Sequence, residues 1–203
     1  IAAARLGGEV AFLGAVSRDF FGDQIVDRLS QNGVGRELVA RVDRPTTLAF
    51  VKKERDGSAR YAFYAIDSAD RALDTAAAPA SLVAGAILQI GSISLIANPE
   101  SDAILRLAEH HRAAGLVVLD PNVRPSLIDD EADFRARIDR ALAASAVLKC
   151  SDEDLGWLFP DDEIEDAASR VLSAGVELVV VTRGAEGSTA FTGDDRIDVP
   201  AVA

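Results

Sequence analysis

Three apolar runs in the chain lead directly into residues whose types could bind an anion. The run at 116–120 (LVVLD) continues as PNVRP, the run at 146–150 (AVLKC) as SDED, and the run at 178–182 (LVVVT) as RGAEG. A guanidinium group and the backbone N–H groups of a glycine-rich loop both donate hydrogen bonds to phosphate or carboxylate oxygens. The chemistry that these segments could support is therefore the binding of a small anionic ligand.

Each segment also has a purely structural explanation. Residues 120–122 (DPN) are common turn formers. Ser151 and Asp154 match the S-x-x-D form of a capping box, which satisfies the free N–H groups at the start of a helix. Gly184 and Gly187 could simply supply positive φ angles in a turn. Taken alone, no segment decides between the two explanations.

The shared position of the three segments favours ligand binding. Arg124 lies between Val123 and Pro125, where a turn has no need of a guanidinium group. All three segments follow predicted strands, and in an open parallel sheet ligands bind beyond the carboxyl ends of the strands. The chain contains no Walker A lysine motif, no G-x-G-x-x-G after a strand and no G-x-S-x-G elbow. A nucleotide would therefore be held by neither of the two commonest loop motifs, and a Ser-His-Asp nucleophile is poorly supported.

Strands and helices alternate along most of the chain. Asp19 is expected to cap the first long helix, and Asn98 is expected to cap a later one. The alternation predicts an α/β fold in which helices cover both faces of a mostly parallel sheet. The predicted strands of this fold lie at 9–17, 86–91, 116–120, 146–150, 178–182 and 195–203.

A different pattern interrupts the alternation from Thr46 onwards. The segment TTLAFVKKERDGSARYAFY contains two β-rich runs around Asp56-Gly57, which is a strong signal for a hairpin. We therefore expect a β-hairpin lid at 46–65, attached to an α/β core that comprises residues 1–45 and 66–203 and is incomplete at both ends.

Composition excludes several classes of function. The chain has 203 residues, a formal net charge of −12 and a sequence pI of about 4.6, so it lacks the basic surface that nucleic acids and anionic membranes require. Cys150 is the single cysteine, which rules out an internal disulfide and fits a reducing cytoplasm. The two histidines, His110 and His111, are adjacent and cannot converge on one metal ion from a helix, so a zinc site is not expected.

Together the motifs resemble those of the ribokinase-like (PfkB) carbohydrate kinases, and among these the bacterial fructokinases. The resemblance covers nearly the whole chain and rests on ARLGGEVAFLGAVSRDFFG, QIGSISLI, VVLDPNVRPSL, LKCSDEDLGWLF and VVVTRGAEGSTAF. It implies a three-layer α/β/α sandwich with a mostly parallel sheet and a small β lid. It also implies transfer of the γ-phosphoryl group of ATP to a sugar hydroxyl in the presence of Mg²⁺.

The same resemblance implies roles for individual residues. Asn122 and Arg124 would bind the sugar or the transferred phosphoryl group, and Phe63 of the lid would cover the sugar. Asp154 would organise Mg²⁺ through water. The residues expected beside the nucleotide are Lys149, Ser151, Thr182, Gly184 and Gly187.

Two departures from the family pattern bear on the substrate and the metal. Asp154 stands where the family often has glutamate, so its carboxylate is one methylene shorter. Ala65 follows Phe63-Tyr64 where many relatives have arginine, which disfavours an acidic sugar such as 2-keto-3-deoxygluconate. Fructose is therefore the expected substrate. The alternatives are a 2-keto-3-deoxygluconate kinase, a ribokinase, a nucleoside kinase, or a family member that binds sugar or nucleotide without catalysis.

The family's catalytic base is expected outside this chain. That aspartate belongs to a glycine-rich motif that would begin beyond Ala203, and the family's GG…N sugar motif would precede Ile1. No residue of this chain is therefore assigned as catalytic, and the chain is expected to be part of a longer kinase. The exposed edges of the lid hairpin lead us to expect a homodimer formed through the lid.

Overall fold

The computed structural model describes residues 1–53 and 59–201. The chain divides into two compact units, Ile1–Pro79 and Ala80–Ala203. The hairpin predicted at 46–65 falls inside the first unit, and the division into a core and a lid remains a prediction.

The first unit combines short parallel strand pairs, one long helix and a hairpin. The strand predicted at 9–17 is two short strands that pair with different partners, β1 with β3 and β2 with β4, both in parallel. The prediction of one continuous strand was wrong because the change of partner depends on contacts with residues 34–42. The elements of this unit are α1 (Ala2–Arg5), β1 (Val10–Ala11), β2 (Gly14–Ser17), α2 (Phe20–Gln31), β3 (Val34–Gly35), β4 (Val39–Val42), β5 (Leu48–Lys53), β6 (Ala59–Tyr64) and the 3-10 helix η1 (Ala69–Ala72).

Strands β5 and β6 form the predicted antiparallel hairpin. Their register pairs Leu48 with Tyr64 at the base and Lys53 with Ala59 at the far end. The predicted Asp56-Gly57 turn lies outside the described residues. The hairpin prediction is therefore confirmed for its two strands.

The second unit is built on one six-stranded sheet in the order β12-β11-β10-β9-β8-β7. The four strands from β7 to β10 are parallel, and β11 and β12 add an antiparallel edge. The strands are β7 (Ile87–Gly91), β8 (Leu116–Asp120), β9 (Val147–Ser151), β10 (Leu178–Thr182), β11 (Ser188–Phe191) and β12 (Arg196–Val199). The α-helices are α3 (Glu100–His111), α4 (Glu131–Ala144), α5 (Asp152–Leu158) and α6 (Ile164–Ser173), and the 3-10 helices are η2 (Ser92–Leu95), η3 (Pro125–Leu127) and η4 (Gly184–Glu186).

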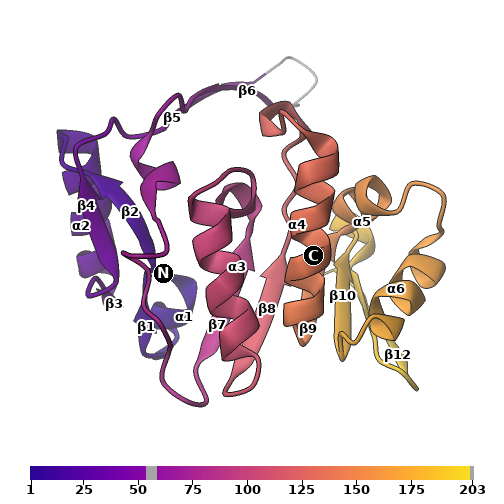
Figure 1. Cartoon of the computed structure of the whole chain (residues 1–203). Helices are drawn as coiled ribbons and strands as arrows, with labels where there is room; N and C mark the ends of the chain where they lie inside the picture. Colours follow the sequence, from indigo (N-terminus) through magenta and orange to yellow (C-terminus); the bar gives the residue numbers. More distant parts are fainter. Residues whose placement is uncertain (54–58, 202–203) are drawn as a thin grey trace. The chain divides into compact units, whose positions relative to one another are not determined.

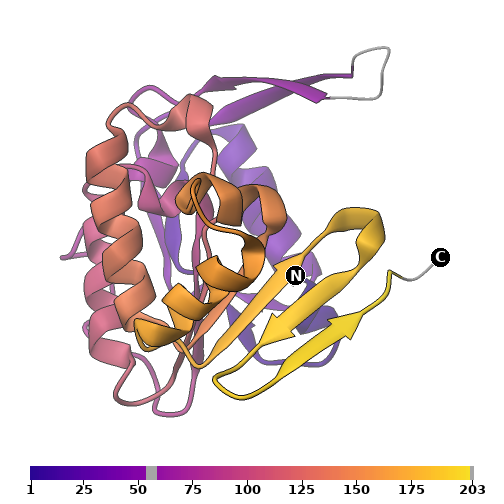
Figure 2. The same cartoon turned by 90° about the vertical axis from the view of Figure 1, so that its right-hand side faces the viewer.

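Helices α3 to α6 cover one face of this sheet, as Figures 1 and 2 show. Alternate strand residues point to opposite faces, and the register places Leu119, Leu148 and Val179 side by side on the face that the helices cover. All three side chains are fully buried there. The opposite face is more open, since the Ile87 side chain on that face is 68% exposed. The core of the unit therefore lies between the sheet and these four helices.

The two predicted helix caps had different outcomes. Asp19 caps α2 as expected, because its side chain accepts a hydrogen bond from the backbone N–H of Gly22. The prediction for Asn98 was wrong. Helix α3 begins at Glu100 with Pro99 at the N-cap position, and the Asn98 side chain accepts from the Ser101 hydroxyl rather than from a backbone N–H.

Candidate functional site

The loop after β8 is tied to the first turn of α5 by the carboxylate of Asp154. Its Oδ1 accepts a 2.8 Å hydrogen bond from the backbone N–H of Val123, and its Oδ2 accepts from the hydroxyl and the N–H of Ser151. The Ser151 hydroxyl in turn accepts from the backbone N–H of Asp154, which completes the capping box. The structural explanation of Ser151 and Asp154 is therefore correct, and the same carboxylate also holds the DPNVR loop beside the carboxyl end of β9.

The Arg124 side chain folds back onto the backbone of this loop. The residue is exposed, and its Nη1 donates to the backbone oxygen of Val123 at 2.9 Å and to that of Asn122 at 3.3 Å. Asn122 adopts a left-handed backbone conformation with φ of 40°, which asparagine tolerates better than most residues. The guanidinium thus lies over its own loop, at the edge of the sheet where the sequence predicted it.

Lys149 and Asp120 form an ion pair between the ends of β9 and β8. Lys149 Nζ donates to Asp120 Oδ2 at 2.9 Å, and the two side chains are 43% and 19% exposed. The other oxygen, Asp120 Oδ1, is buried and has no hydrogen-bond partner among the described residues. Sequence reasoning considered Asp120 only as a turn former. The pair depends on the β8–β9 register, which places Leu119 opposite Leu148 and which the sequence did not specify.

The segment TRGAEG forms the connection between β10 and β11. Thr182 pairs with Ser188 across the hairpin, and the N–H of Arg183 donates to the backbone oxygen of Gly187 at 2.7 Å. Gly184 and Gly187 both have positive φ angles, 50° and 94°. A Cβ on Gly187 would lie 2.0 Å from a backbone oxygen of β12, whereas a Cβ on Gly184 would meet nothing within 4 Å. Gly187 is therefore required by packing, while Gly184 faces open space.

Thr182 is positioned by the parallel pairing of β10 with β9. It lies opposite Ser151, and its hydroxyl donates to the backbone oxygen of Cys150 at 3.3 Å, which is long for such a bond. Cys150 points into the helix-covered core, where burial raises the pKa of its thiol to about 12. Because side chains alternate along a strand, Lys149 lies on the face opposite to Cys150.

The second unit therefore brings together most of the predicted site. The residues that meet at the carboxyl ends of β8, β9 and β10 are Asn122, Arg124, Lys149, Ser151, Asp154, Thr182, Gly184 and Gly187. Phe63 belongs to the first unit, where it pairs with Ala49 across the hairpin and is half-buried. Its predicted place over the sugar remains a prediction.

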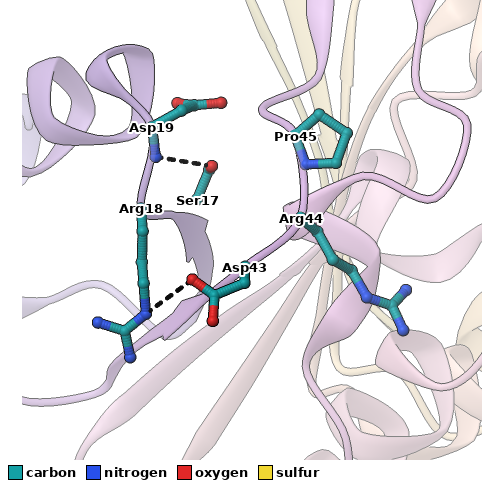
Figure 3. Close-up of a pocket in the computed structure, with 6 residues that line it drawn as sticks. All are labelled: Ser17, Arg18, Asp19, Asp43, Arg44 and Pro45. Carbon is teal, nitrogen blue, oxygen red and sulfur yellow. Dashed lines mark hydrogen bonds and ion pairs between the residues drawn. The ribbon is translucent and has the colours of Figure 1, made fainter.

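The first unit contains a pocket of about 440 Å³ that sequence reasoning missed. Its lining comes from the ends of β2 and β4, and Figure 3 shows the Asp19 carboxylate pointing across it toward the segment of Pro45. Arg18 bridges to Asp43 at 3.3 Å on one side. Hydrogen bonds from the N–H of Gly22 and from Thr46 lower the pKa of Asp19 far below its usual range. Only the capping role of Asp19 was visible in the sequence.

Among residues 1–53 and 59–201, no three histidine, cysteine, aspartate or glutamate side chains gather in a way that could hold a metal ion. Both oxygens of Asp154 accept hydrogen bonds, and its predicted contact with Mg²⁺ through water remains a prediction. In the same part of the chain, every helix is too short or too polar to cross a lipid bilayer.

A mostly parallel sheet with an arginine-bearing loop, a helix N-terminus and a glycine turn at its carboxyl edge defines an α/β protein of the ribokinase-like fold. The model of the pfkB family of carbohydrate kinases matches residues 1–203, and the chain belongs to that family. A fructokinase of Rhizobium leguminosarum bv. trifolii is 38% identical over 200 residues, which are 98% of this chain and 61% of the relative. The chain thus spans about three fifths of the length of that relative.

Solved structures agree with this assignment. A fructokinase from Vibrio cholerae O395 with fructose, ADP and calcium ion bound is 28% identical, with a TM-score of 0.86 over all of this chain and 66% of that one. A fructokinase from Xylella fastidiosa with bound ATP is 26% identical, with a TM-score of 0.87 over 98% of this chain and 64% of that one. The predicted ribokinase-like α/β fold with a mostly parallel sheet is confirmed, and within the second unit helices α3 to α6 all lie on the same face of that sheet (Figures 1 and 2).

Proposed function

We propose that this chain acts in the ATP-dependent phosphorylation of a sugar hydroxyl, with fructose as the sugar. The observation that carries the proposal is the hydrogen bond from the Val123 N–H to Asp154, because it holds the loop of Arg124 beside the end of β9, the strand that carries Lys149. Phosphoryl transfer depends mainly on positioning and on the stabilisation of negative charge. The cations Arg124 and Lys149, beside the backbone N–H groups of the glycine turn, suit the stabilisation of this negative charge.

The nucleotide phosphates would lie against the ends of β9 and β10. The open space at Gly184 lets a phosphate approach the backbone, and its N–H can donate there. The long contact of the Thr182 hydroxyl with Cys150 can be exchanged for a phosphate oxygen at little cost. Lys149 and Ser151 lie one strand further along the same edge, and Gly187 completes the turn.

The sugar would bind on the side of the β8 loop. Arg124 is exposed and, among the contacts described, only its Nη1 donates, to backbone oxygens of its own loop, so the rest of its guanidinium is available for a sugar or a transferred phosphoryl oxygen. Asn122 lies two residues before it and offers an amide. Phe63 of the hairpin would cover the sugar and exclude water, which otherwise competes as the phosphoryl acceptor.

Magnesium would be held by the ATP phosphates and, through water, by Asp154. When bound, it would neutralise developing charge on the phosphate oxygens. The contribution of this chain is to fix the Asp154 carboxylate beside Ser151 and Val123. The base that removes the proton of the sugar hydroxyl is not assigned to a residue of this chain.

The choice of a neutral sugar rests on residue 65. Ala65 offers no cation to a sugar carboxylate, and the curated relative named above is a fructokinase. An acidic sugar buried beside Ala65 would lack a partner for its charge, which is costly. Fructose is therefore preferred to 2-keto-3-deoxygluconate.

A sugar panel tests this function. The protein is expressed from its complete reading frame, and ADP release is followed with fructose, ribose, 2-keto-3-deoxygluconate and nucleosides. We expect the highest kcat/KM with fructose. Turnover on another member of the panel would overturn the substrate, and thermal stabilisation by ATP or sugar without ADP release would indicate a binding protein instead.

Two further proposals concern the setting of the protein. The hairpin strands have exposed edges, and Phe50 and Tyr64 on one face are 59% and 64% exposed, so we place the contact of a homodimer there. A monomer in sedimentation analysis would exclude it. A cytoplasmic location fits the free, buried thiol of Cys150.

A further inference from the structure

The two legs of the β5–β6 hairpin are joined to each other at its base. The backbone oxygen of Pro45 accepts from the N–H of Ala69 at 2.8 Å, and Arg44 forms a 2.7 Å ion pair with Asp67. Asp67 has a left-handed backbone conformation with φ of 50°, which turns the chain as it leaves β6. The legs therefore enter and leave the hairpin as one connected unit.

One carboxylate connects this base to helix α2. Asp19 Oδ2 accepts from the backbone N–H of Thr46 at 2.9 Å, and Asp19 Oδ1 accepts from the Thr46 hydroxyl at 2.7 Å. The same Oδ1 accepts from the N–H of Gly22 in the first turn of α2 at 2.8 Å. Figure 3 shows how Asp19 faces the entering leg across the pocket. Asp19 thus joins the start of α2 to the residue that stands two positions before β5.

The helix end of this connection is held firmly. A Cβ on Gly22 would lie 2.0 Å from the backbone oxygen of Ser17, so the first turn of α2 packs directly on the end of β2. The Ser17 hydroxyl also accepts from the N–H of Asp19 at 3.0 Å. The position of Asp19 is therefore set by contacts within β2 and α2, independently of Thr46.

The face of the hairpin that carries Phe50 and Tyr64 is exposed. An isolated two-stranded hairpin is marginally stable in water, and the Phe50–Tyr64 ring pair lies largely in solvent. Contacts at the base therefore help to set the direction in which the strands leave the unit. They include a hydrogen bond from the Thr47 hydroxyl to Asp70 and the bonds from Thr46 to the charged Asp19, and hydrogen bonds to a charged acceptor are stronger than those between neutral groups.

We propose that Asp19, acting through Thr46, is the anchor that orients the hairpin as a lid, and that both are positioning residues for phosphoryl transfer. This inference rests on the proposed kinase function. Loss of the anchor leaves the lid loosely placed over the sugar, and water then enters. Water in place of the sugar hydroxyl attacks the γ-phosphorus, the bond from phosphorus to the ADP oxygen breaks, and ADP, inorganic phosphate and a proton are released.

The test replaces Thr46 with valine, which is nearly the same size but lacks the hydroxyl. ADP and sugar phosphate are measured in parallel with the best sugar of the panel. For Thr46→Val we expect a rise of about tenfold in the sugar KM and more than one ADP per sugar phosphate, since one hydrogen bond to a charged group is lost. Thr46→Ser keeps the hydroxyl and should match the wild type in both. If Thr46→Val keeps the wild-type ratio of ADP to sugar phosphate and the wild-type sugar KM, the proposed anchoring role of Thr46 is wrong.

Amide hydrogen exchange tests the anchoring role of Thr46 without measuring enzyme activity. In Thr46→Val, exchange should accelerate by about tenfold in β5 and β6, remain unchanged in β8 to β10, and return to the wild-type rate in Thr46→Ser. Unchanged exchange in β5 and β6 would overturn the anchor. A wild-type protein that releases no ADP with any sugar would overturn the proposed function, and the exchange rates would still decide the anchor.

Discussion

Asp154 Oδ1 lies 2.8 Å from the backbone nitrogen of Val123, although the two residues are 31 positions apart in the chain. The contact joins a loop that follows β8 to a helix that follows β9. It thereby brings two segments that are distant in the sequence together at one edge of the sheet. Because Asp154 is also the third helical residue of α5 and completes the capping box with Ser151, a single side chain supports both the helix start and the loop that carries Arg124.

Replacing Asp154 should therefore cost more than an ordinary helix cap. Asp154→Ala removes the carboxylate half of the capping box, which is worth about 1 kcal/mol, and leaves the Val123 N–H without its partner, which costs about 1–3 kcal/mol more. We expect the free energy of unfolding to fall by about 2–4 kcal/mol in urea titrations. The matched control is Glu153→Gln on the exposed side of the same turn, which should stay close to the wild type. Equal stability of the two variants would contradict a stabilising role of the Val123–Asp154 hydrogen bond.

The two glycines of TRGAEG should respond differently to alanine. Gly187→Ala places a Cβ against the backbone of β12 at a φ of 94°, so we expect a loss of about 3 kcal/mol or more. Gly184→Ala meets no atom and should cost only about 1 kcal/mol for its φ of 50°. Its Cβ would instead occupy the proposed phosphate approach and raise the KM for ATP by about tenfold. Chemical denaturation and ATP titration separate the two effects, and an unchanged ATP KM in Gly184→Ala would remove the turn from the nucleotide site.

Arg124 should matter for turnover and not for folding. The residue is exposed and donates only to backbone oxygens of its own loop among the contacts described, so Arg124→Ala should change the free energy of unfolding by no more than about 0.5 kcal/mol. Removal of a cation that stabilises transferring phosphoryl charge should lower kcat by about 100-fold or more. Arg106→Ala, which breaks an exposed ion pair with Asp102, serves as the control and should leave kcat unchanged. Wild-type kinetics in Arg124→Ala would exclude it from the site.

Cys150 should be protected from thiol reagents and should make the protein sensitive to alkali. Burial, with smaller contributions from Asp154 and Asp120, raises the pKa of its thiol from 9.0 to about 12. The unfolded thiol loses its proton first, so stability is unaffected below about pH 9 and declines as the pH rises from there to about 12. We expect an aromatic disulfide reagent to label one thiol after unfolding in guanidinium chloride and none in the native protein at mildly alkaline pH. Rapid labelling of the native protein would show that the thiol is accessible.

Local features of the site were predictable because they depend on residues close in sequence. The helix cap at Asp19 and the capping box of Ser151 and Asp154 need only three or four consecutive residues, and both formed as the patterns indicate. The cap expected at Asn98 did not form: the backbone N–H of Ser101 donates to the backbone oxygen of Ala97, and the Asn98 side chain accepts from the Ser101 hydroxyl instead. Even a short-range signal can therefore be overridden by another short-range partner.

The sequence by itself determined most of the strands and helices of the second unit, through the spacing of apolar residues, and which loops carry polar groups at strand ends. Only the tertiary structure decided what those groups contact. The bond from Val123 to Asp154, the ion pair of Lys149 with Asp120 and the tight approach of β12 to Gly187 all depend on which strands pair and in which register. Pairing is a cooperative, long-range outcome of burying one face of a sheet, and no local pattern of residues specifies the partner.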